Sequence, residues 1–384
     1  MKLLFCIKAM NNPGGGAERV LAIVANGLLG RGHQVSVLSF DQPGGPCFYP
    51  LEPGIGRLDL GIGSTSRRAT VFGTLRRIAA LRRRVHAVAP DVAIGFMHSM
   101  FVPLGLALWG SAIPVVASEH IVPEHYASRP LEAALLRLTP WIATRITCVS
   151  ESVKATYPPA LRRKMTAIAN PVVVDGGGRA DVAGEGRARK AVLSVGRLEP
   201  QKDHATLIEA FALIAKDLPE WDLRILGDGG LRPDLEALVA RYRLDQRVHF
   251  CGTTRDVSVE YLAAQLFVTP SRYESFGLST AEALAYGLPV VGFADCPGTN
   301  QLIRPGVNGE LADGSGDRAA ALARTLWPLM KDPARRIDLV DRNGGIPESC
   351  RPDAVIDAWE NLLVDVLRSR REAGRGEKRL GFRA

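Results

Sequence analysis

Short apolar segments alternate with segments of helical period along most of the chain. Before residue 170, the apolar segments that predict buried strands are 2–7, 34–40, 91–95, 114–118, 146–149 and 165–169. After residue 190, they are 191–195, 222–226, 248–251, 266–268 and 289–293. Between many of them, apolar positions recur every three or four residues, as on one face of a helix. This alternation predicts an α/β protein in which helices cover both faces of parallel sheets.

The alternation is interrupted once, just after residue 174, by a glycine-rich stretch of small and polar residues with no period. Such a composition is typical of a linker between domains. We therefore expect two tandem, doubly wound, Rossmann-like domains over 1–174 and 190–350, joined by a linker over 175–189. A helix over 351–371 has an apolar stripe to bury, and crossing back to the first domain would bury it. A basic tail over 372–384 follows.

Length and composition support this division. With 384 residues, the chain exceeds one ordinary domain. Its six cysteines are scattered without a C-x-x-C pair, so we expect neither a zinc site nor a disulfide framework. No apolar run approaches the ~20 residues of a membrane span, and the apolar N-terminal stretch is too short for a signal peptide. These features predict a cytoplasmic protein.

Positive charge is concentrated in one segment. The net charge is +8, and residues 61–90 contain seven arginines but no aspartate or glutamate. Ile78, Leu81 and Val85 recur at helical spacing, which predicts an amphipathic, arginine-rich helix that includes 67–84. One interpretation is an outer helix with a solvated charged face. The other is contact with an anionic membrane surface or a phosphate-bearing acceptor. Nucleic acid is not an expected partner, because no aromatic residues alternate with these arginines.

The stretch that begins with the predicted strand 266–268 combines several features of a binding loop. A Pro-Ser turn ends the strand, a loop carries Glu274 and Gly277, and a helix is predicted to start at Ser279. In open α/β sheets, ligands bind at the carboxyl ends of strands, and helix starts offer N–H groups to anions such as a diphosphate. A structural interpretation competes with this one. Ser279 and Glu282 have the spacing of a capping box, in which the glutamate only bonds a backbone N–H.

A loop of consecutive glycines lies near the start of the chain. Gly14, Gly15 and Gly16 separate the strand predicted over 2–7 from a helix predicted over 17–29. A glycine loop at a helix start can cradle phosphates. The spacing does not match the G-x-G-x-x-G dinucleotide fingerprint, however, and any tight turn between strand and helix can require glycine.

Two cations follow the first strand of the second domain. Arg197 comes directly after the strand predicted over 191–195, and Lys202 lies five residues further on. Two cations near a helix start favour a diphosphate site. Surface ion pairs of these cations with Glu199 and Asp203 are the alternative.

One class of ligand fits all these loops. The cations and the helix start suit a diphosphate. Glu274 can accept hydrogen bonds from hydroxyl groups, which suits a sugar, and Glu282 can bind a ribose diol even if it also caps the helix. Among the seven histidines, His120 follows the carboxyl end of the strand 114–118 and could reach a ligand from the first domain, although a structural role is equally open. The sequence therefore favours a nucleotide-sugar donor.

Longer motifs point to a family. The second domain contains Gly196-Arg197-Leu198 with Gln201-Lys202, Gly227-Asp228-Gly229, Val248-x-Phe250-x-Gly252, and Pro270-Ser271-x-x-Glu274-x-Phe276-Gly277 followed by Glu282-Ala283-x-Ala285-x-Gly287-x-Pro289-Val290. These motifs resemble those of the family 4 retaining glycosyltransferases, which have the two-domain GT-B fold. The first domain contains Gly15-Gly16-Ala17-Glu18-Arg19-Val20, Ser118-Glu119-His120, Val149-Ser150-x-Ser152-Val153 and Asn170-Pro171-Val172. It resembles the members that extend bacterial surface or lipid-linked glycans.

The resemblance implies roles at the donor diphosphate. Arg197 and Lys202 would neutralise its charge, while Gly15 and Gly16 would approach it from the first domain. Glu274 would bind a hydroxyl of the donor sugar.

The resemblance also implies contacts to the rest of the donor. Phe276, Gly277 and Leu278 would offer backbone groups to the sugar and phosphate, Glu282 would hold the ribose, and His120 would contact the sugar near the reacting carbon. The expected catalytic group therefore comprises His120 and three residues named above, Glu274, Arg197 and Lys202.

The implied reaction moves a hexose or N-acetylhexosamine from a nucleoside diphosphate to a hydroxyl of a glycan or lipid-linked acceptor, with retention of configuration. The resemblance favours UDP as the nucleotide. The acceptor-side first domain and the donor-side second domain would face a cleft. Neither a metal nor a cofactor is expected, because Arg197, Lys202 and the helix dipole would stabilise the departing diphosphate. One position departs from the family: Gln301 stands where relatives usually carry glutamate.

Two rival functions remain open. A sugar-nucleotide epimerase of similar fold would release an altered sugar nucleotide without needing an acceptor. A non-catalytic nucleotide-sugar-binding protein would bind the donor without turnover. If the arginine-rich helix binds lipid, the protein would be peripheral on the inner face of a membrane.

Overall fold

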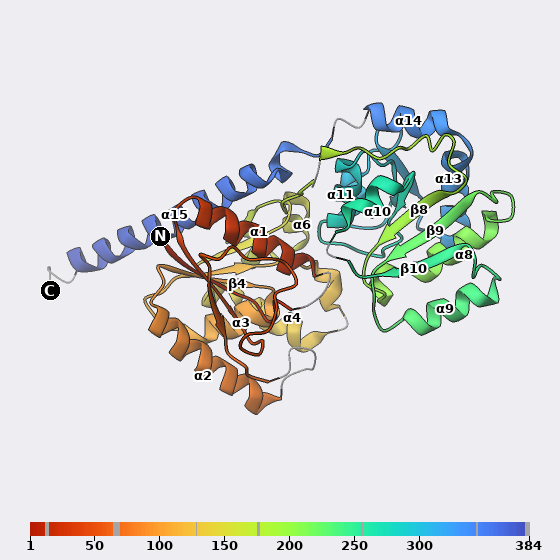
Figure 1. Cartoon of the computed structure of the whole chain (residues 1–384). Helices are drawn as coiled ribbons and strands as arrows, with labels where there is room; N and C mark the ends of the chain where they lie inside the picture. The colour runs from red at the N-terminus through yellow and green to blue at the C-terminus, as the bar shows by residue number, and fades with distance from the viewer. Residues whose placement is uncertain are drawn as a thin grey trace. The chain divides into compact units, whose positions relative to one another are not determined.

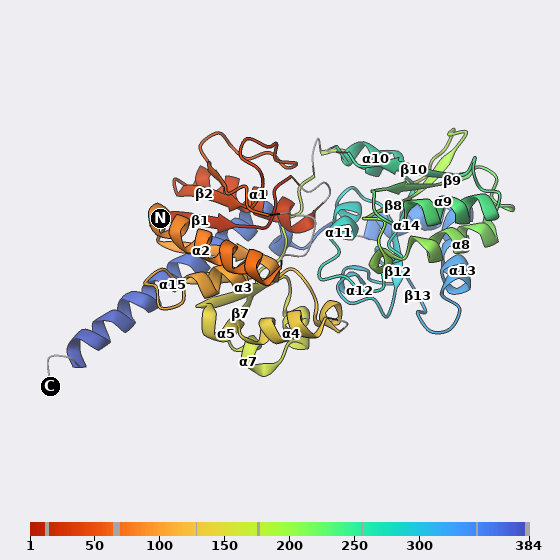
Figure 2. The same cartoon turned by 90° about the horizontal axis from the view of Figure 1, so that it is seen from below.

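The computed structural model describes residues 1–11, 15–63, 70–127, 129–174, 177–254, 256–342 and 345–380. The chain divides into two compact units (Figure 1). Unit 1 comprises Met1–Pro171 and Ser349–Ala384, and unit 2 comprises Val172–Glu348. Each unit is built around a parallel sheet with helices packed against it (Figures 1 and 2).

Unit 1 contains a 7-stranded sheet in the order β3-β2-β1-β4-β5-β6-β7 among its described residues. Its strands are β1 (Lys2–Cys6), β2 (Gln34–Ser39), β3 (Gly56–Asp59), β4 (Val92–Phe96), β5 (Val115–Ser118), β6 (Arg145–Cys148) and β7 (Met165–Ala167). Its helices are α1 (Gly16–Gly30), α2 (Val71–Val88), α3 (His98–Ala107), η1 (Pro123–Tyr126), α4 (Pro130–Arg137), α5 (Thr139–Ile142), α6 (Glu151–Thr156), α7 (Pro159–Arg162) and α15 (Pro352–Leu380), which the short η4 (Glu348–Cys350) precedes.

Unit 2 contains a 6-stranded sheet in the order β10-β9-β8-β11-β12-β13 among its described residues. Its strands are β8 (Lys190–Val195), β9 (Trp221–Leu226), β10 (Val248–Gly252), β11 (Leu266–Val268), β12 (Val290–Phe293) and β13 (Gly309–Ala312). Its helices are η3 (Pro200–Lys202), α8 (His204–Ile214), α9 (Arg232–Arg241), α10 (Ser258–Ala263), α11 (Leu278–Ala285), α12 (Thr299–Leu302), α13 (Arg318–Lys331) and α14 (Pro333–Arg342).

The strand order explains where a ligand can bind in each unit. In both sheets the chain first adds strands on one side of the starting strand and then continues on its other side. The order therefore reverses between β1 and β4 in unit 1, and between β8 and β11 in unit 2. Doubly wound sheets bind ligands at the carboxyl ends of the two strands that flank such a switch point. The predicted fold class, two doubly wound α/β domains, is confirmed.

Most of the strands that the sequence predicted are largely buried, although β7 and β10, which were also predicted, are edge strands with few buried residues. All five residues of β4 are buried, so the strand is a continuous apolar run. The edge strands β3 and β13 were missed. β3 has no buried residue, and only the end residues of β13 are buried, so neither carries a strong apolar signal.

The C-terminal helix α15 packs alongside α1 in unit 1 (Figure 1). Trp359 is 2% exposed, and its ring stacks on Phe96 of β4 with centroids 5.9 Å apart. Ile356 fills the space beside Gly27, where a Cβ would clash with it. The apolar stripe of α15 thus forms part of the core of unit 1. The helix continues to Leu380, through most of the segment expected to be a tail.

Much of the segment expected to be a linker packs onto unit 2. Residues 175–176 lie outside the described part of the chain. Beyond them, Ala180 and Val182 are buried in a core cluster of unit 2. The guanidinium of Arg336 is fully buried and donates from Nε to the Val182 carbonyl at 2.7 Å and from Nη2 to the Ala183 carbonyl at 2.9 Å. Composition alone did not reveal these anchors, because the anchoring arginine is remote in sequence.

The arginine-rich helix is α2. Its apolar side is buried against its own unit at Leu81 and Val85, and Arg82 donates to the Ala107 carbonyl at the end of α3 (2.7 Å). Arg67 and Arg68 lie outside the described residues. No described helix is both long enough and apolar enough to span a membrane.

Candidate functional site

Two candidate residues of unit 2 meet at its switch point. Lys202 lies at the end of η3, in the loop that follows β8, and Glu274 lies in the loop that follows β11. The Lys202 Nζ is 2.5 Å from the Glu274 Oε1. The Ser271 hydroxyl donates to the same oxygen at 2.7 Å. Because Glu274 is only 8% exposed, this ion pair is largely shielded from water, which strengthens its hydrogen bonds.

Backbone contacts hold these two loops together. The Gln201 side-chain amide donates to the Tyr273 carbonyl at 2.8 Å, and the Arg272 N–H donates to the Gln201 carbonyl at 2.9 Å. The Glu274 N–H donates to the Pro297 carbonyl at 3.0 Å. The loops after β8, β11 and β12 therefore form one connected structure around Lys202 and Glu274.

Asp203, the residue after Lys202, anchors the same structure through arginines that sequence analysis missed. Its backbone is left-handed, with φ of 50°, and its carboxylate is 3.0 Å from Arg272 and 3.9 Å from Arg318. The Arg318 guanidinium lies 3.7 Å over the ring of Phe293 and also pairs with Asp295 at 2.7 Å. Arg318 begins α13, far along the chain from Lys202, and no local pattern distinguishes it from other helix-start arginines.

Two glycines allow the loop after β8 to approach the loop after β9. Gly227 has φ of +145°, and a Cβ on it would clash with the Gly196 carbonyl. A Cβ on Gly229 would lie 2.5 Å from the Leu198 carbonyl oxygen. The Leu198 N–H donates to the Asp228 carbonyl at 3.0 Å. The motif Gly227-Asp228-Gly229 therefore supports the loop that carries Arg197 and Lys202.

The start of α11 lies beside the ion pair in the same loop. Gly277 is its N-cap, with φ of +81°, and a Cβ there would lie 2.5 Å from Thr299 Cγ2. Phe276 is buried and Leu278 is half-buried. The expected capping box is wrong, because the helix starts at Leu278 and Ser279 therefore lies inside it rather than at the N-cap.

Glu282 instead takes part in a buried contact with an aromatic cluster. It is 4% exposed, and its Oε2 accepts from the Tyr261 hydroxyl at 2.9 Å. Tyr261 in turn stacks on Tyr286 with centroids 5.2 Å apart. Tyr261 comes from α10, and no local sequence pattern links it with Glu282.

Arg197 does not join the ion pair of Lys202. Its side chain is half exposed (48%) and pairs with Glu199 at 2.8 Å. The alternative of a surface pair is thus the observed one for Arg197, whereas Lys202 pairs with Glu274 and not with Asp203. An exposed pair of this kind is weak, so it leaves Arg197 available to a ligand.

In unit 1, His120 lies just beyond the carboxyl end of β5. Its Nε2 is 2.8 Å from the Ser118 hydroxyl, and its ring stacks on Phe96 with centroids 5.1 Å apart. Burial lowers the pKa of His120 to about 4, although a hydrogen bond with Asn170 acts in the opposite direction. The imidazole is therefore neutral near pH 7 and can offer a hydrogen bond, but no positive charge.

A hydrogen-bonded chain next to His120 was not predicted. The buried Glu119 accepts from the Tyr126 hydroxyl at 2.8 Å, and that hydroxyl is 2.9 Å from Nδ1 of His98. His98 Nε2 lies 3.3 Å from Glu132. Burial raises the pKa of Glu119 to about 7. His98 begins α3 directly after β4, which is a strand-end position like that of His120 and was the available signal.

The two glycines expected to approach the diphosphate lie at the start of α1. Gly15 is buried and is the N-cap, and a Cβ there would clash with the carboxylate of Glu18. Gly16 is exposed, with open space around it. Gly14 lies outside the described residues. Gly15 thus has a local packing reason to be glycine, whereas Gly16 has open space beside it.

Two family models match the chain. The model described as Glycosyltransferase Family 4 matches residues 14–175, and the one described as Glycosyl transferases group 1 matches residues 180–343. Together they cover most of the chain, with one model in each unit. The chain belongs to the family 4, group 1 glycosyltransferases.

Individual relatives agree with this assignment. The glycosyltransferase is 27% identical over 356 residues to an uncharacterized glycosyltransferase of Haemophilus influenzae, covering 91% of this chain and 96% of that protein. It is 27% identical over 375 residues to a Campylobacter jejuni enzyme, covering 95% and 99%. That enzyme is the GalNAc-alpha-(1->4)-GalNAc-alpha-(1->3)-diNAcBac-PP-undecaprenol alpha-1,4-N-acetyl-D-galactosaminyltransferase.

Among solved structures, HepE from Anabaena in complex with UDP and glucose matches with a TM-score of 0.77 at 20% identity. The match covers 95% of this chain and 99% of HepE. At this identity the likeness bears on the fold alone. The glycosyltransferase has the GT-B fold.

Proposed function

We propose that this glycosyltransferase transfers a hexose or N-acetylhexosamine from a nucleoside diphosphate, UDP by preference, to a hydroxyl of a glycan or lipid-linked acceptor, with retention of configuration. The observation that carries the proposal is the contact of Lys202 with Glu274 at the switch point of unit 2, beside the start of α11. A cation, a hydroxyl-binding carboxylate and free helix N–H groups are what a sugar diphosphate requires.

The relatives support the finer parts of the proposal. The C. jejuni enzyme is named for adding N-acetylgalactosamine to a glycan on undecaprenol diphosphate. HepE was solved with UDP and glucose. A UDP-linked donor and a lipid-linked acceptor are therefore the first candidates to test for this chain.

The proposed binding step exchanges partners around Lys202. Without donor, Lys202 neutralises Glu274. When the donor diphosphate binds, Lys202 donates to phosphate oxygens, and Glu274 accepts from a sugar hydroxyl in place of the lysine. Ser271 keeps its hydrogen bond to Glu274 and so holds the carboxylate in position. Arg197 leaves its exposed partner Glu199 to add a second positive charge at the diphosphate.

The proposed chemistry needs no covalent intermediate. The acceptor oxygen attacks the anomeric carbon on the face from which the diphosphate leaves. The bond from that carbon to the phosphate oxygen breaks, and the leaving phosphate takes the acceptor proton. Lys202, Arg197 and the α11 start stabilise the charge that develops on the diphosphate. Glu282 holds the ribose, and the neutral His120 donates a hydrogen bond to the donor sugar.

The remaining candidates follow the resemblance. Gly16, beside Gly15 at the start of α1, offers an open backbone surface for the donor from unit 1. Phe276, Gly277 and Leu278 offer backbone groups from unit 2. The arginine-rich α2 supports a membrane contact, so we propose that the enzyme works on the inner face of a membrane.

A panel of nucleotide sugars tests the proposal. Purified enzyme is incubated with each donor, first alone and then with a short lipid-linked glycan, and the products are separated by chromatography. We expect one donor to release its nucleoside diphosphate, and NMR to show the same anomeric configuration in product and donor. Conversion of the donor into an isomeric sugar nucleotide would identify an epimerase, and binding without any turnover would identify a non-catalytic protein.

A further inference from the structure

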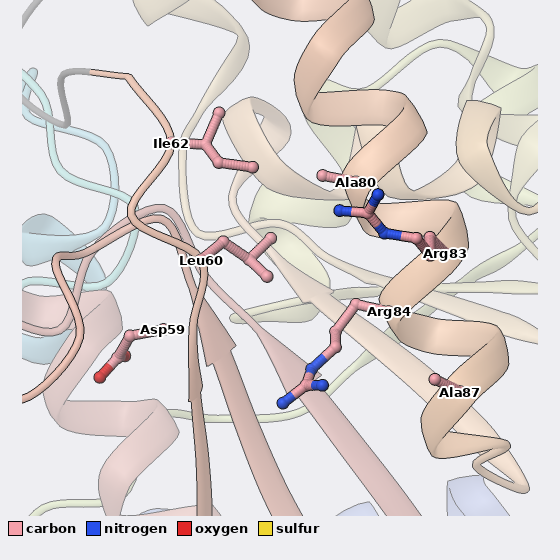
Figure 3. Close-up of a pocket in the computed structure, with 7 residues that line it drawn as sticks. All are labelled: Asp59, Leu60, Ile62, Ala80, Arg83, Arg84 and Ala87. Atoms are coloured by element: carbon pink, nitrogen blue, oxygen red, sulfur yellow. The ribbon is translucent and has the colours of Figure 1, made fainter.

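Charged and polar side chains gather at two places in unit 1 besides the proposed donor site. One is a cavity of about 410 Å³ between α2 and the residues of and after β3, and its charged lining residues are Asp59, Arg83 and Arg84 (Figure 3). Both arginines are exposed, so the fold leaves their guanidinium groups solvated. The other place lies where β4 and β5 end, and it contains a chain of hydrogen-bonded side chains. A chain of this kind holds polar groups in fixed positions, which is what recognition of a ligand requires.

The chain joins the loop after β5 to the starts of α3 and α4. Glu119, which follows β5, and Tyr126, which ends η1, are both buried. The Tyr126 hydroxyl lies 2.8 Å from Oε2 of Glu119 and 2.9 Å from Nδ1 of His98, the first residue of α3. On the other side of the imidazole, Nε2 lies 3.3 Å from Oε2 of Glu132 in α4. Four side chains from three segments are therefore connected in one line.

The order of these groups determines where one hydrogen lies. The Tyr126 hydroxyl has a single hydrogen. If it donates that hydrogen to Glu119, Nδ1 of His98 must carry a hydrogen of its own, and if it donates to Nδ1, Glu119 must be protonated. The Glu132 carboxylate only accepts, so Nε2 of His98 carries a hydrogen in both arrangements. The chain therefore shares one proton between Glu119 and His98 and directs an N–H at Glu132.

The end of the chain at His98 and Glu132 is open to solvent. Their side chains are 17% and 24% exposed. Their separation of 3.3 Å exceeds the roughly 2.7–2.9 Å of a strong charge-assisted hydrogen bond, so a small polar group can replace this contact. A hydroxyl can accept from the N–H and donate to the carboxylate at the same time. A phosphate fits less well, because Glu132 would repel it. The pair therefore suits a sugar hydroxyl.

Two observations connect this pair with the reaction. The Glu119 carboxylate also accepts from the backbone N–H groups of Ile121, at 3.0 Å, and of His120, so the same carboxylate holds the loop of the proposed donor-sugar contact. Met97, directly before His98, has φ of 67° and ψ of 149°, a backbone conformation that is strained for a residue with a side chain. Such strain is often found at functional sites, where the surrounding structure maintains it. Both observations favour a role for His98 in function rather than only in stability.

We propose that His98 and Glu132 bind a hydroxyl of an acceptor sugar. The hydroxyl accepts from Nε2 of His98 and donates to the carboxylate of Glu132. Tyr126 and Glu119 act as positioning residues, since they keep the hydrogen on Nε2 and fix the ring. The inference rests on the proposed function and deepens it, because it assigns a glycan as acceptor rather than a lipid phosphate without a sugar. The bound hydroxyl is not the attacking one, whose proton goes to the leaving phosphate.

Kinetics with simple acceptors test the site. The probes are p-nitrophenyl glycosides of hexoses and N-acetylhexosamines, used with the donor that the panel identifies. Glu132→Gln keeps the size of the side chain but weakens the acceptor of the sugar hydroxyl, and we expect it to raise the acceptor KM by roughly tenfold. Release of nucleoside diphosphate without acceptor should stay at the wild-type rate, as should both reactions of Glu52→Gln, which changes an exposed glutamate elsewhere in unit 1. An unchanged acceptor KM in Glu132→Gln, or an equal loss of rate with and without acceptor, would overturn the site.

Tyr126→Phe tests the positioning role, because it removes only the hydroxyl that connects Glu119 with His98. We expect the acceptor KM to rise by about threefold or more, with no change in the donor KM. Long-range proton–nitrogen NMR correlation on protein with isotope-labelled histidine should show a hydrogen on Nε2 of His98 in wild type and a mixture of the two neutral forms in Tyr126→Phe. A hydrogen on Nδ1 alone in wild type would overturn the proton chain.

Binding can also be measured without turnover. Saturation-transfer NMR with the same glycosides should show binding to wild type and weaker binding to Glu132→Gln. Equal binding by both proteins, or no binding by wild type, would overturn the site. If the glycosides bind as expected but no donor is turned over, the proposed function fails while the sugar-binding site stands.

Discussion

Glu274 shares one carboxylate oxygen, Oε1, between the ammonium of Lys202 at 2.5 Å and the hydroxyl of Ser271 at 2.7 Å. This pairing gives Glu274 a structural partner that the sequence did not suggest. The same two groups are the ones that a sugar diphosphate would separate. The ion pair of Lys202 and Glu274 therefore holds the loops of unit 2 together and is also the proposed binding site for the donor.

The charge of Glu274 can be removed with little change in shape. Glu274→Gln keeps an oxygen that can accept from Ser271, but it loses the attraction to Lys202 and the stronger acceptor for a sugar hydroxyl. We expect kcat to fall by roughly 10²-fold, with a smaller change in donor KM. Steady-state kinetics measure both constants. Glu185→Gln, which changes an exposed glutamate elsewhere in unit 2, is the control. A wild-type kcat in Glu274→Gln would remove this residue from the donor site.

Gly298 tests whether the backbone of the Glu274 loop matters. Its φ is +85°, and a Cβ would lie 2.5 Å from the Glu274 carbonyl oxygen and 3.1 Å from the Phe276 nitrogen. Gly298→Ala should displace this loop and reduce turnover strongly.

Gly306→Ala is the matched control for Gly298→Ala, since Gly306 has φ of +71° and open space around it. It should cost only the strain of a left-handed alanine, about 1 kcal/mol, and keep its turnover. Urea denaturation of the two variants measures the loss of stability from backbone strain, and their kinetics measure the effect of displacing the Glu274 loop. Equal effects in both would contradict the close contact at Gly298.

Stability should depend on pH through Glu119. Burial raises its pKa from 4.5 to about 7. The folded chain therefore holds this proton over a range in which the unfolded chain has lost it. The stabilising contribution is complete below about pH 4.5 and is lost as the pH rises through 7.

Comparison with Glu119→Gln isolates this contribution. The free energy of unfolding of wild type, minus that of the variant, should fall from pH 5 to pH 8 by up to about 3 kcal/mol. The exposed Glu124, exchanged for glutamine in the same way, should show no such trend. A flat difference for Glu119→Gln would mean that the carboxyl titrates normally.

Substitution of Trp359 tests how much the packing of α15 contributes to the stability of unit 1. Its burial against Phe96 predicts that Trp359→Ala costs about 3–5 kcal/mol of folding free energy. Trp141→Ala should cost little, because Trp141 is 71% exposed. Denaturation of unit 1 can be followed by tryptophan fluorescence and hydrogen exchange. Similar stability of both variants would show that α15 is dispensable for the core of unit 1.

The parts of the fold that could be predicted are those with a local signal. The central strands were found because parallel strands covered on both faces are continuous apolar runs, and the edge strands β7 and β10 were found from shorter apolar segments. The edge strand β3 lacks such a run and was missed. Lys202 and Glu274 were chosen as candidates by their position, after the strands that became β8 and β11, and the structure brings the two side chains together.

The partners of these residues could not be predicted, because they depend on contacts between distant segments. Gln201 binds the backbone of Tyr273, and Arg318 approaches Asp203 from the start of α13. The capping box failed for a related reason. The left-handed conformation of Gly277, packed against Thr299, starts the helix before Ser279.

The most direct test of the central claim compares Lys202→Ala with wild type and with Lys216→Ala, an exposed lysine just beyond α8. The measurement is the rate of nucleoside diphosphate release from the donor that the panel identifies. We predict that Lys202→Ala lowers the rate by roughly 10²- to 10³-fold while both variants keep the wild-type melting temperature within a few degrees. A wild-type rate in Lys202→Ala would contradict the assignment of the donor diphosphate to this site.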